Sequence, residues 1–282
     1  MLTNKLSAAR RVYTAVMRVL LLLAAVLTAA LVVFMIVYVL YKGLPYVTWH
    51  LISTKPSYIT GAIGILPDIC NTMQILLASL LIVLPLGVGA AVYLTEYAQN
   101  KKLVAAIEYA AETLSGIPSI IYGLFGMLFF VTALKCGYSM MAGAATLAIM
   151  VLPVIMRTTE EALLCVPDSF REGSFGLGAG KLRTIFKIVL PSAIPGILSG
   201  IILAIGRIVG ETAALIYTSG TVANLAGFFD SGRTLAIHMY SLSREGMHTN
   251  EAYATAVVLL IVVLIINGVS SLIAKKFEAP KQ

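Results

Sequence analysis

The chain has 282 residues, of which 59% are hydrophobic and only 12% are charged, and its mean hydropathy is +0.94. A soluble domain carries roughly 45–50% apolar and about 25% charged residues, so this composition excludes a water-soluble fold. The formal charge of +7 at pH 7 comes from few ionisable groups. Where these groups lie along the chain therefore says more about partners than their sum does.

Six stretches are long and apolar enough to cross a membrane as helices. A hydrocarbon core of about 30 Å requires roughly 20 apolar residues in helical conformation. The first stretch exceeds the roughly 7–15 apolar residues of a cleavable signal peptide, so we expect it to remain as an anchor. The predicted spans are Val19 to Tyr41, Met73 to Thr95, Thr113 to Leu134, Ser139 to Met156, Ala193 to Ser219 and Ala252 to Ala274.

The distribution of Lys and Arg predicts that both termini are cytoplasmic, because basic residues accumulate in the segments that stay inside. Fourteen of the 20 basic residues fall in the predicted inner segments and only five in the outer ones, while Arg207 lies within a span. The positive charge is therefore a feature of membrane topology. The lipid bilayer is an expected partner and nucleic acid is not.

Two outer segments are long, covering residues 43–71 and 220–251. The first is rich in Pro and Gly, and it is expected to hold a short interfacial helix around Tyr46–Leu51, with Trp49 at headgroup depth. Neither segment is long enough to bury a core of its own. We therefore expect no soluble domain.

Motifs for enzymatic or metal chemistry are missing from the sequence. The cysteines Cys70, Cys136 and Cys165 have neither CxxC nor metal-ligand spacing, and whether the first two pair stays open. There is no HExxH or GxSxG motif, and the histidines His50, His238 and His248 all fall in outer segments, away from any predicted buried base. The sequence thus predicts no catalytic site, no metal and no cofactor.

The longest inner loop, residues 157–192, has a regular internal pattern. Ser169 and Glu172 have the spacing of a capping box, which predicts a short helix starting near Phe170. Three glycines at 176, 178 and 180 then interrupt that helix. Apolar residues at helical spacing from Leu182 to Leu190 predict a second helix, so that the two form a projecting knob. By pattern alone, the basic face of this knob also suits an amphipathic segment lying on the anionic inner leaflet.

Two ionisable residues lie inside the fifth predicted span, with Arg207 at its middle and Glu211 four residues further on. Because ionisable groups at bilayer depth are costly, they are functional candidates. A spacing of four places both on one face of a helix, where they can pair. The guanidinium offers a planar fork of donors that matches an oxyanion. An ion pair that only joins two helices is the structural alternative.

Small and hydroxylated residues accompany this pair. Gly196 and Gly200, and Gly206 and Gly210, have the small-xxx-small spacing that allows close helix contact. Candidate hydroxyls for a substrate pathway are Ser115, Ser119, Tyr122 and Thr212, although each can instead be satisfied by its own or a neighbouring helix. Pro118 is expected to kink or start the helix of the third span.

The inner loop resembles the EAA loop of ABC-importer permease subunits, whose pattern is E-A-A-x3-G-x9-I-x-L-P. Glu172, Gly178 and the run Ile188 to Pro191 meet this spacing, whereas Gly173 and Ser174 replace the two alanines. In that family the loop docks into a groove of the ATP-binding subunit. The resemblance implies that Glu172 and Gly178 dock and that Ile188, Leu190 and Pro191 set the second helix.

The segment from Leu203 to Ala213 is similar to the A-R-x-x-G-E-T-A segment of phosphate-importer permeases, with Gly206 in place of the usual Ala. Pro118 to Leu124 and Arg157 to Glu160 also resemble that family, and the latter run favours its PstA type over its PstC type. The resemblance covers about residues 70–275. It implies a substrate pathway that includes Arg207, Glu211, Thr212 and Ser119.

Taken together, the pattern and the resemblance imply an all-α integral membrane protein with six transmembrane helices and a type I ABC-importer (MetI-like) transmembrane domain. The expected organisation is a cytoplasmic segment (1–18), the first span with its external loop (19–69), the permease domain (70–275) and a cytoplasmic tail (276–282).

The implied function is that of a plasma-membrane permease subunit, not itself an enzyme, that forms half of a phosphate pore. Its implied partners are a second permease of PstC type, an ATP-binding subunit dimer and an extracytoplasmic phosphate-binding protein. A permease for another oxyanion such as sulfate or molybdate is the nearest alternative. A stand-alone channel or secondary transporter is the alternative of another class.

Overall fold

The computed structural model describes residues 8–57, 63–246 and 248–277, and all regular elements within these ranges are helical. The parts of the predicted cytoplasmic ends and of the first outer loop that lie beyond these ranges are outside the described residues. The membrane-length elements are α1 (Ala8–Gly43), α3 (Leu66–Val92) with η2 (Tyr93–Tyr97), α6 (Met140–Leu164), α8 (Lys181–Thr184) with η4 (Ile185–Val189) and α9 (Leu190–Val209), and α12 (Thr249–Phe277).

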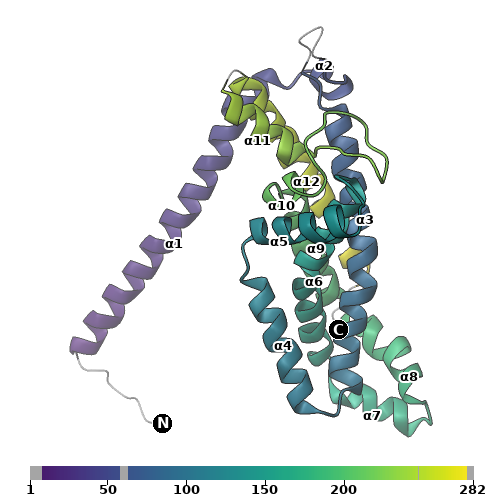
Figure 1. The fold of residues 1–282 in the computed structure, drawn as a ribbon. Helices are drawn as coiled ribbons and strands as arrows, with labels where there is room; N and C mark the ends of the chain where they lie inside the picture. Colours follow the sequence, from purple (N-terminus) through teal and green to yellow (C-terminus); the bar gives the residue numbers. More distant parts are fainter. Residues whose placement is uncertain (1–7, 58–62, 247, 278–282) are drawn as a thin grey trace.

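The described part of the chain contains five helices long and apolar enough to cross a membrane, and a sixth if a bent pair counts as one span. The all-helical membrane fold predicted from the sequence is thereby confirmed. In Figure 1, α3, α6, α9 and α12 form a bundle, and α1 diverges from it. Close packing joins α1 to α12 at Gly43, where a Cβ would lie only 2.7 Å from the carbonyl carbon of Tyr253.

The two ends of the bundle carry different elements (Figure 1). The start of α1 lies toward one end, as do α7 (Asp168–Gly176) and α8, and this end is called the inner end after the topology that the sequence predicts. The short helices α2 (Trp49–Ser53) and α11 (Leu235–Glu245) lie at the other end. Thr48 starts α2 as its N-cap, accepting a hydrogen bond from the Leu51 N–H at 3.1 Å, and Trp49 is 80% exposed. This agrees with the short outer helix expected there.

The third predicted span is broken before Pro118, where the sequence predicts a kink or a helix start, and its first residues belong to a separate helix. It is divided between α4 (Lys101–Ser115) and α5 (Ser119–Gly126) with η3 (Met127–Ala133), and these two parts meet at an angle of 100°. Pro118 has extended backbone angles and immediately precedes α5. A proline disfavours helical conformation in the residue before it, which explains why α4 cannot continue. The expectation that Pro118 starts a helix is confirmed.

The fifth predicted span also differs from the structure. The helix that contains it begins at Lys181, inside the predicted loop, and ends at Val209 rather than Ser219. Gly210 and Glu211 follow without helical structure, and a short helix, α10 (Ala213–Ile216), comes next. One continuous rod therefore joins the inner knob to the middle of the molecule.

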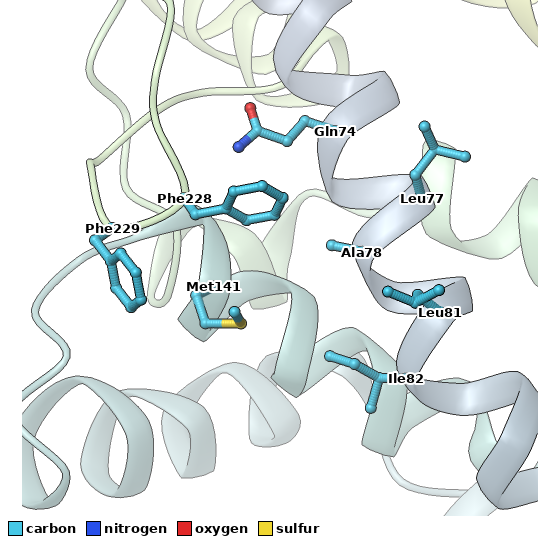
Figure 2. A pocket seen from close by; sticks show the side chains of 8 residues that line it. All are labelled: Gln74, Leu77, Ala78, Leu81, Ile82, Met141, Phe228 and Phe229. Atoms are coloured by element: carbon cyan, nitrogen blue, oxygen red, sulfur yellow. The ribbon is translucent and has the colours of Figure 1, made fainter.

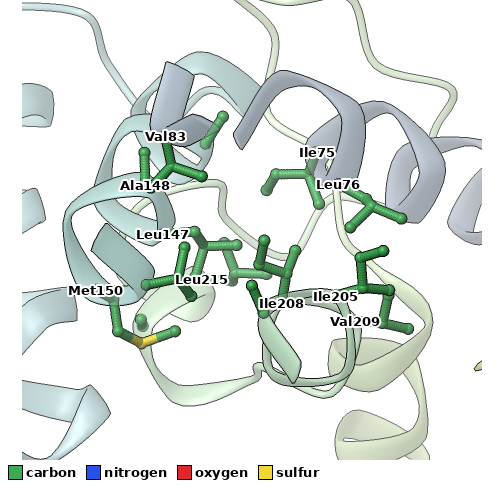
Figure 3. Close-up of a cluster of buried hydrophobic side chains, with 14 of the residues drawn as sticks. Ile75, Leu76, Val83, Leu147, Ala148, Met150, Ile205, Ile208, Val209 and Leu215 are labelled. Carbon is green, nitrogen blue, oxygen red and sulfur yellow. The ribbon is translucent and has the colours of Figure 1, made fainter. Parts of the chain in front are cut away.

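The principal core lies where α3, α6, α9 and α10 meet (Figure 3). Ile75, Leu147, Ile208 and Leu215 are almost completely buried in it. Gly196 and Gly200 pack against Ala162 and Thr158 of α6, which confirms the first small-xxx-small pair, whereas no neighbouring helix crowds Gly206 or Gly210. Small residues therefore allow close contact between the rod and α6 near its inner end, whereas large side chains such as Ile208 hold the rod in the core beside Arg207.

Candidate functional site

The inner knob consists of α7, a glycine turn and α8. Gly178 has φ +82°, a left-handed conformation that favours glycine. The Gly178 N–H donates to the Phe175 carbonyl at 2.9 Å and the Ala179 N–H donates to the Ser174 carbonyl at 3.1 Å. This pair of bonds is a Schellman motif, which ends a helix by satisfying its last carbonyls. The predicted interruption is confirmed, and Gly178 is the residue that makes the turn.

The predicted capping box is not formed, which corrects the expected helix start. The helix α7 begins at Asp168 with Pro167 at the N-cap and no side-chain cap. Ser169 therefore lies inside the first turn, where its hydroxyl is not placed to cap. Glu172 does not take part in a capping box and is exposed on the knob surface.

The two positions that depart from the EAA pattern have different surroundings. Ser174 is 4% exposed, and its hydroxyl lies 2.8 Å from that of Thr184 in α8, so a buried hydrogen bond joins the two arms of the knob. Gly173 is exposed, and a Cβ added there would meet no atom within 4 Å. Ser174 thus contributes to the hairpin, whereas nothing in this chain requires glycine at 173.

The exposed surface of the knob combines large apolar side chains with charged ones, among them Arg183 and Lys187. Leu177 is 91% exposed and Leu182 is 64% exposed, while Ile185 and Val189 on the same predicted stripe are buried. A cavity of about 300 Å³ lies beside Gly178 and is lined in part by Leu177 and Ile188. Exposed apolar side chains around a concave surface are typical of a protein docking site. Leu190 is half-buried, and Pro191 lies in the first turn of α9, where a proline is tolerated.

Arg207 and Glu211 lie at a helix break and not at the centre of a long helix, which corrects the sequence prediction. Arg207 is in the last turn of α9, and Glu211 lies beyond its end. The Glu211 carboxylate accepts a hydrogen bond from the Ala214 N–H at 3.0 Å, so it caps α10. No ion pair joins the two side chains within the described part of the chain. The half-buried guanidinium is therefore left for another partner.

The break between α9 and α10 packs against the start of α5. A Cβ at Gly123 would lie 2.7 Å from the Ala214 Cα, so the two backbones are in direct contact. The Tyr122 hydroxyl donates to the Leu114 carbonyl at 2.8 Å, bridging the bend, and Tyr122 is buried in the same core as Ile208 of α9. Ser119 is one turn before Gly123, on the α5 face toward α10. The structure thus brings the predicted residues of α5 and α9 into one region.

The hydroxyls of this region differ in their availability. Ser115 donates to the Ala111 carbonyl of its own helix at 3.1 Å, which is the alternative to a pathway role that the sequence left open for this hydroxyl. Thr212 has only a 3.5 Å contact with the Gly210 carbonyl, at the limit of a hydrogen bond, and it is half-buried. Among the candidate hydroxyls, Thr212 and Ser119 therefore remain predictions for the pathway.

Sequence reasoning missed a buried polar cluster at the outer end of α3. The Arg233 Nε donates to Asp68 Oδ1 at 2.8 Å, and the Asp68 side chain has no exposed surface. Asn71 donates to the carbonyls of Asn224 and Arg233 and accepts from the Ala226 N–H at 3.1 Å. These bonds hold the irregular segment 217–234 on α3. The paired residues are more than 150 positions apart, so local spacing carries no indication of them.

His238 belongs to the same cluster, which corrects the prediction that no histidine faces a buried base. Its side chain is 2% exposed, and its Nδ1 lies 3.7 Å from Asp68 Oδ2. Burial lowers the pKa of His238 to about 3, and the Arg233 charge contributes in the same direction. The imidazole is therefore neutral at physiological pH. The cysteines Cys70, Cys136 and Cys165 are all free, which answers the open question of pairing.

A cavity of about 720 Å³ lies between α3, the start of α6 and the outer segment (Figure 2). Leu77, Leu81, Met141 and Phe228 are among its lining residues, and Gln74 is the polar side chain there. An oxyanion needs several converging donors, which this apolar lining does not supply. None of the sequence-predicted pathway residues lines this cavity. It is therefore not the anion site that the sequence predicts.

Similarity to known proteins agrees with this architecture. The chain is 37% identical over 278 residues to a probable ABC transporter permease protein, YqgI, of Bacillus subtilis, covering 91% of this chain and 95% of that protein. It is 35% identical over 228 residues to the phosphate transport system permease protein PstA of Yersinia pestis, covering 79% of this chain and 76% of that one.

Among solved structures, a chain of the MetNI methionine ABC transporter in an inward-facing conformation matches with a TM-score of 0.61 and 22% identity. The match covers 80% of this chain and all of that chain, and it supports a fold of the type I importer (MetI-like) class. The family model described as "binding-protein-dependent transport system inner membrane component" matches residues 83–279. The chain is a multi-pass membrane protein that belongs to this family of ABC-importer permease subunits.

Proposed function

We propose that this chain is the permease subunit of an ATP-driven phosphate importer and forms half of its translocation pore. The observation that carries this proposal is the continuous helical rod from Lys181 to Val209. The rod has the knob at one end and Arg207 in its last turn at the other. Movement of the knob would therefore be transmitted along this helix to the half-buried guanidinium of Arg207.

Phosphate is the substrate that the chemistry around Arg207 supports best. A guanidinium donates two parallel hydrogen bonds to an oxyanion, and a low-dielectric setting strengthens them. Glu211 is engaged with the backbone of α10 and leaves the Arg207 charge uncompensated. The similarity to a PstA protein favours phosphate over sulfate or molybdate. In this proposal Thr212 and Ser119 supply further donors along the pathway.

Coupling to ATP hydrolysis is assigned to the knob, with the hydrolysis itself in a partner subunit. Glu172, Gly178 and the exposed Leu177 would face a groove of the ATP-binding subunit. Buried Ile185 and Val189 anchor the second arm, while Ile188, Leu190 and Pro191 direct it into α9. Closure of the ATP-binding dimer would then shift the pore between outward and inward access by changing the populations of two states.

The assembly follows from the same assignment. One chain supplies half of a pore, so a second, homologous permease of PstC type completes it. With both termini and the knob on the cytoplasmic side, the end that carries α2 and α11 faces an extracytoplasmic phosphate-binding protein. No cofactor is required in this chain.

The test is phosphate uptake by the assembled complex in proteoliposomes. Arg207→Ala is expected to lower uptake by about 10- to 100-fold, since a charged hydrogen bond contributes about 1.5–3 kcal/mol. Arg207→Lys, which keeps the charge without the fork, should retain part of the rate. Arg18→Ala, an exposed residue of α1, is the matched control. Normal uptake by Arg207→Ala, or faster uptake of sulfate than of phosphate by the unchanged complex, contradicts the assignment.

A further inference from the structure

Arg171 of α7 joins three segments of the chain at the cytoplasmic end. Its Nη2 and Nε donate to Glu96 Oε1 at 2.8 and 3.1 Å. The same guanidinium donates to the carbonyls of Leu163 at 3.0 Å and Val166 at 2.8 Å, at the end of α6. The side chains of Arg171 and Glu96 are 17% and 10% exposed. One nearly buried group therefore links the knob, α6 and α3.

A second contact joins the knob to the same end of α3. Lys181 Nζ, in α8, lies 4.9 Å from the centre of the Tyr97 ring. Glu96 and Tyr97 both belong to η2, the wide π-helical turn in which α3 ends. Such turns are frequent at functional sites in helices. Both arms of the knob are therefore attached to η2, one through Arg171 and the other through Lys181.

A purely structural role accounts for only part of this arrangement. The bonds to Leu163 and Val166 satisfy carbonyls at the end of α6, a common task for a basic residue. They do not require a carboxylate on a third helix. The forked geometry of Arg allows it to hold the carbonyls and Glu96 together, which the single ammonium of Lys cannot reproduce.

We infer that the Arg171–Glu96 pair is a coupling element that makes α3 move with the knob. The helical rod transmits movement of the knob to α9. The Arg171–Glu96 pair transmits the same movement to α3, so that α3 and α9 are displaced together. The inference rests on the proposed function, in which the knob docks on an ATP-binding subunit. Arg171 acts here as a positioning residue, because it does not touch the substrate pathway.

The decisive variant is Glu96→Gln, tested in the assembled complex with its ATP-binding subunits and liganded binding protein. It leaves the bonds from Arg171 to the α6 carbonyls in place, so the knob keeps its fold. We expect ATP-binding subunits to co-purify normally and basal ATPase activity to be unchanged. Stimulation of ATPase activity by the binding protein, and phosphate uptake, should each fall by about tenfold.

The matched control is Asp168→Asn, because Asp168 binds the same guanidinium at 3.1 Å but is 87% exposed. An exposed pair contributes little, so uptake should stay within about twofold of the unchanged complex. Arg171→Gln combined with Glu96→Gln should lose no more than Arg171→Gln alone, since both changes remove the same ion pair.

Two results would overturn the inference. One is uptake and stimulation by Glu96→Gln within about twofold of the unchanged complex. The other is loss of the ATP-binding subunits from Glu96→Gln, which would make the pair a folding contact of the knob. Failure of the proposed function looks different, because then the unchanged complex itself shows no phosphate uptake or retains no ATP-binding subunit.

Discussion

The two ends of α3 are both held by an arginine from a distant segment, but the two attachments differ. At the outer end, Asp68 is fully buried and Arg233 is almost so, with Asn71 adding bonds to the same segment. At the inner end, Glu96 belongs to a π-helical turn, and the side chains of Glu96 and Arg171 are 10% and 17% exposed. A fully buried carboxylate resists separation from its partner, whereas a partly exposed pair can be rearranged more easily. We therefore expect the outer end to be the more rigid of the two.

The largest expected effect is at the outer anchor. Arg233→Ala leaves the buried Asp68 carboxylate without its partner, which should destabilise the protein by about 3–5 kcal/mol. Thermal unfolding of the purified protein in detergent measures this loss. Leu51→Ala, at the same end of the molecule and 4% exposed, is an apolar control for simple loss of packing. A melting temperature unchanged by Arg233→Ala would mean that the outer pair is not an anchor.

Acidification should weaken the outer anchor next. The pKa of His238 is about 3 in the folded protein, below its usual value of 6.5, so the unfolded state takes up the proton first. The contribution of His238 to stability is then complete above about pH 6.5 and falls progressively toward pH 3; between pH 7 and pH 5 it falls by about 2 kcal/mol, measured as the difference between the unchanged protein and His238→Leu. Melting temperatures across this range test the trend.

His238→Leu, which removes the titrating group, should reduce the loss of stability on acidification. A pH dependence identical in His238→Leu and the unchanged protein would assign the effect to other groups. The inner attachment contains no histidine within the described part of the chain, so the two ends should respond differently to acid.

The inner attachment should matter less for stability than for coupling. Glu96→Gln keeps an acceptor oxygen beside Arg171, so the free energy of unfolding should fall by only about 1 kcal/mol. The same thermal unfolding experiment compares it with Arg233→Ala. A loss as large as that at the outer end would show that both ends of α3 are rigid anchors.

The smallest effect is expected within the knob. Gly173→Ala places a methyl group where no atom lies within 4 Å, in a helix, so stability should rise by up to about 1 kcal/mol.

Gly123→Ala in α5 has the opposite expected effect, because the added Cβ meets the Ala214 backbone and should destabilise by about 1–3 kcal/mol. Equal melting temperatures for the two variants would contradict the packing described around α5 and α10.

Local patterns predict the two helices and the turn of the knob, because these features depend on residues a few positions apart. The turn at Gly178 and the second arm both follow from spacings of a few positions. The helix start was predicted wrongly because Pro167 and Asp168 define it and not Ser169. At Arg207 the apolar run continues to Ser219 while the helix ends at Val209, so hydropathy conceals the break. The sequence identifies Arg207 and Glu211 as unusual but not how they are placed.

The sequence by itself determined the membrane class, the number of apolar segments and the position of the knob, since these depend on composition and short spacings. Only the tertiary structure decided that the third span bends by 100° and that Glu211 caps α10 instead of pairing with Arg207. It also decided that arginines 75 and 165 positions away hold the two ends of α3. The physical reason is that a buried charge selects its partner by proximity after packing. Neither hydropathy nor helical periodicity contains that information.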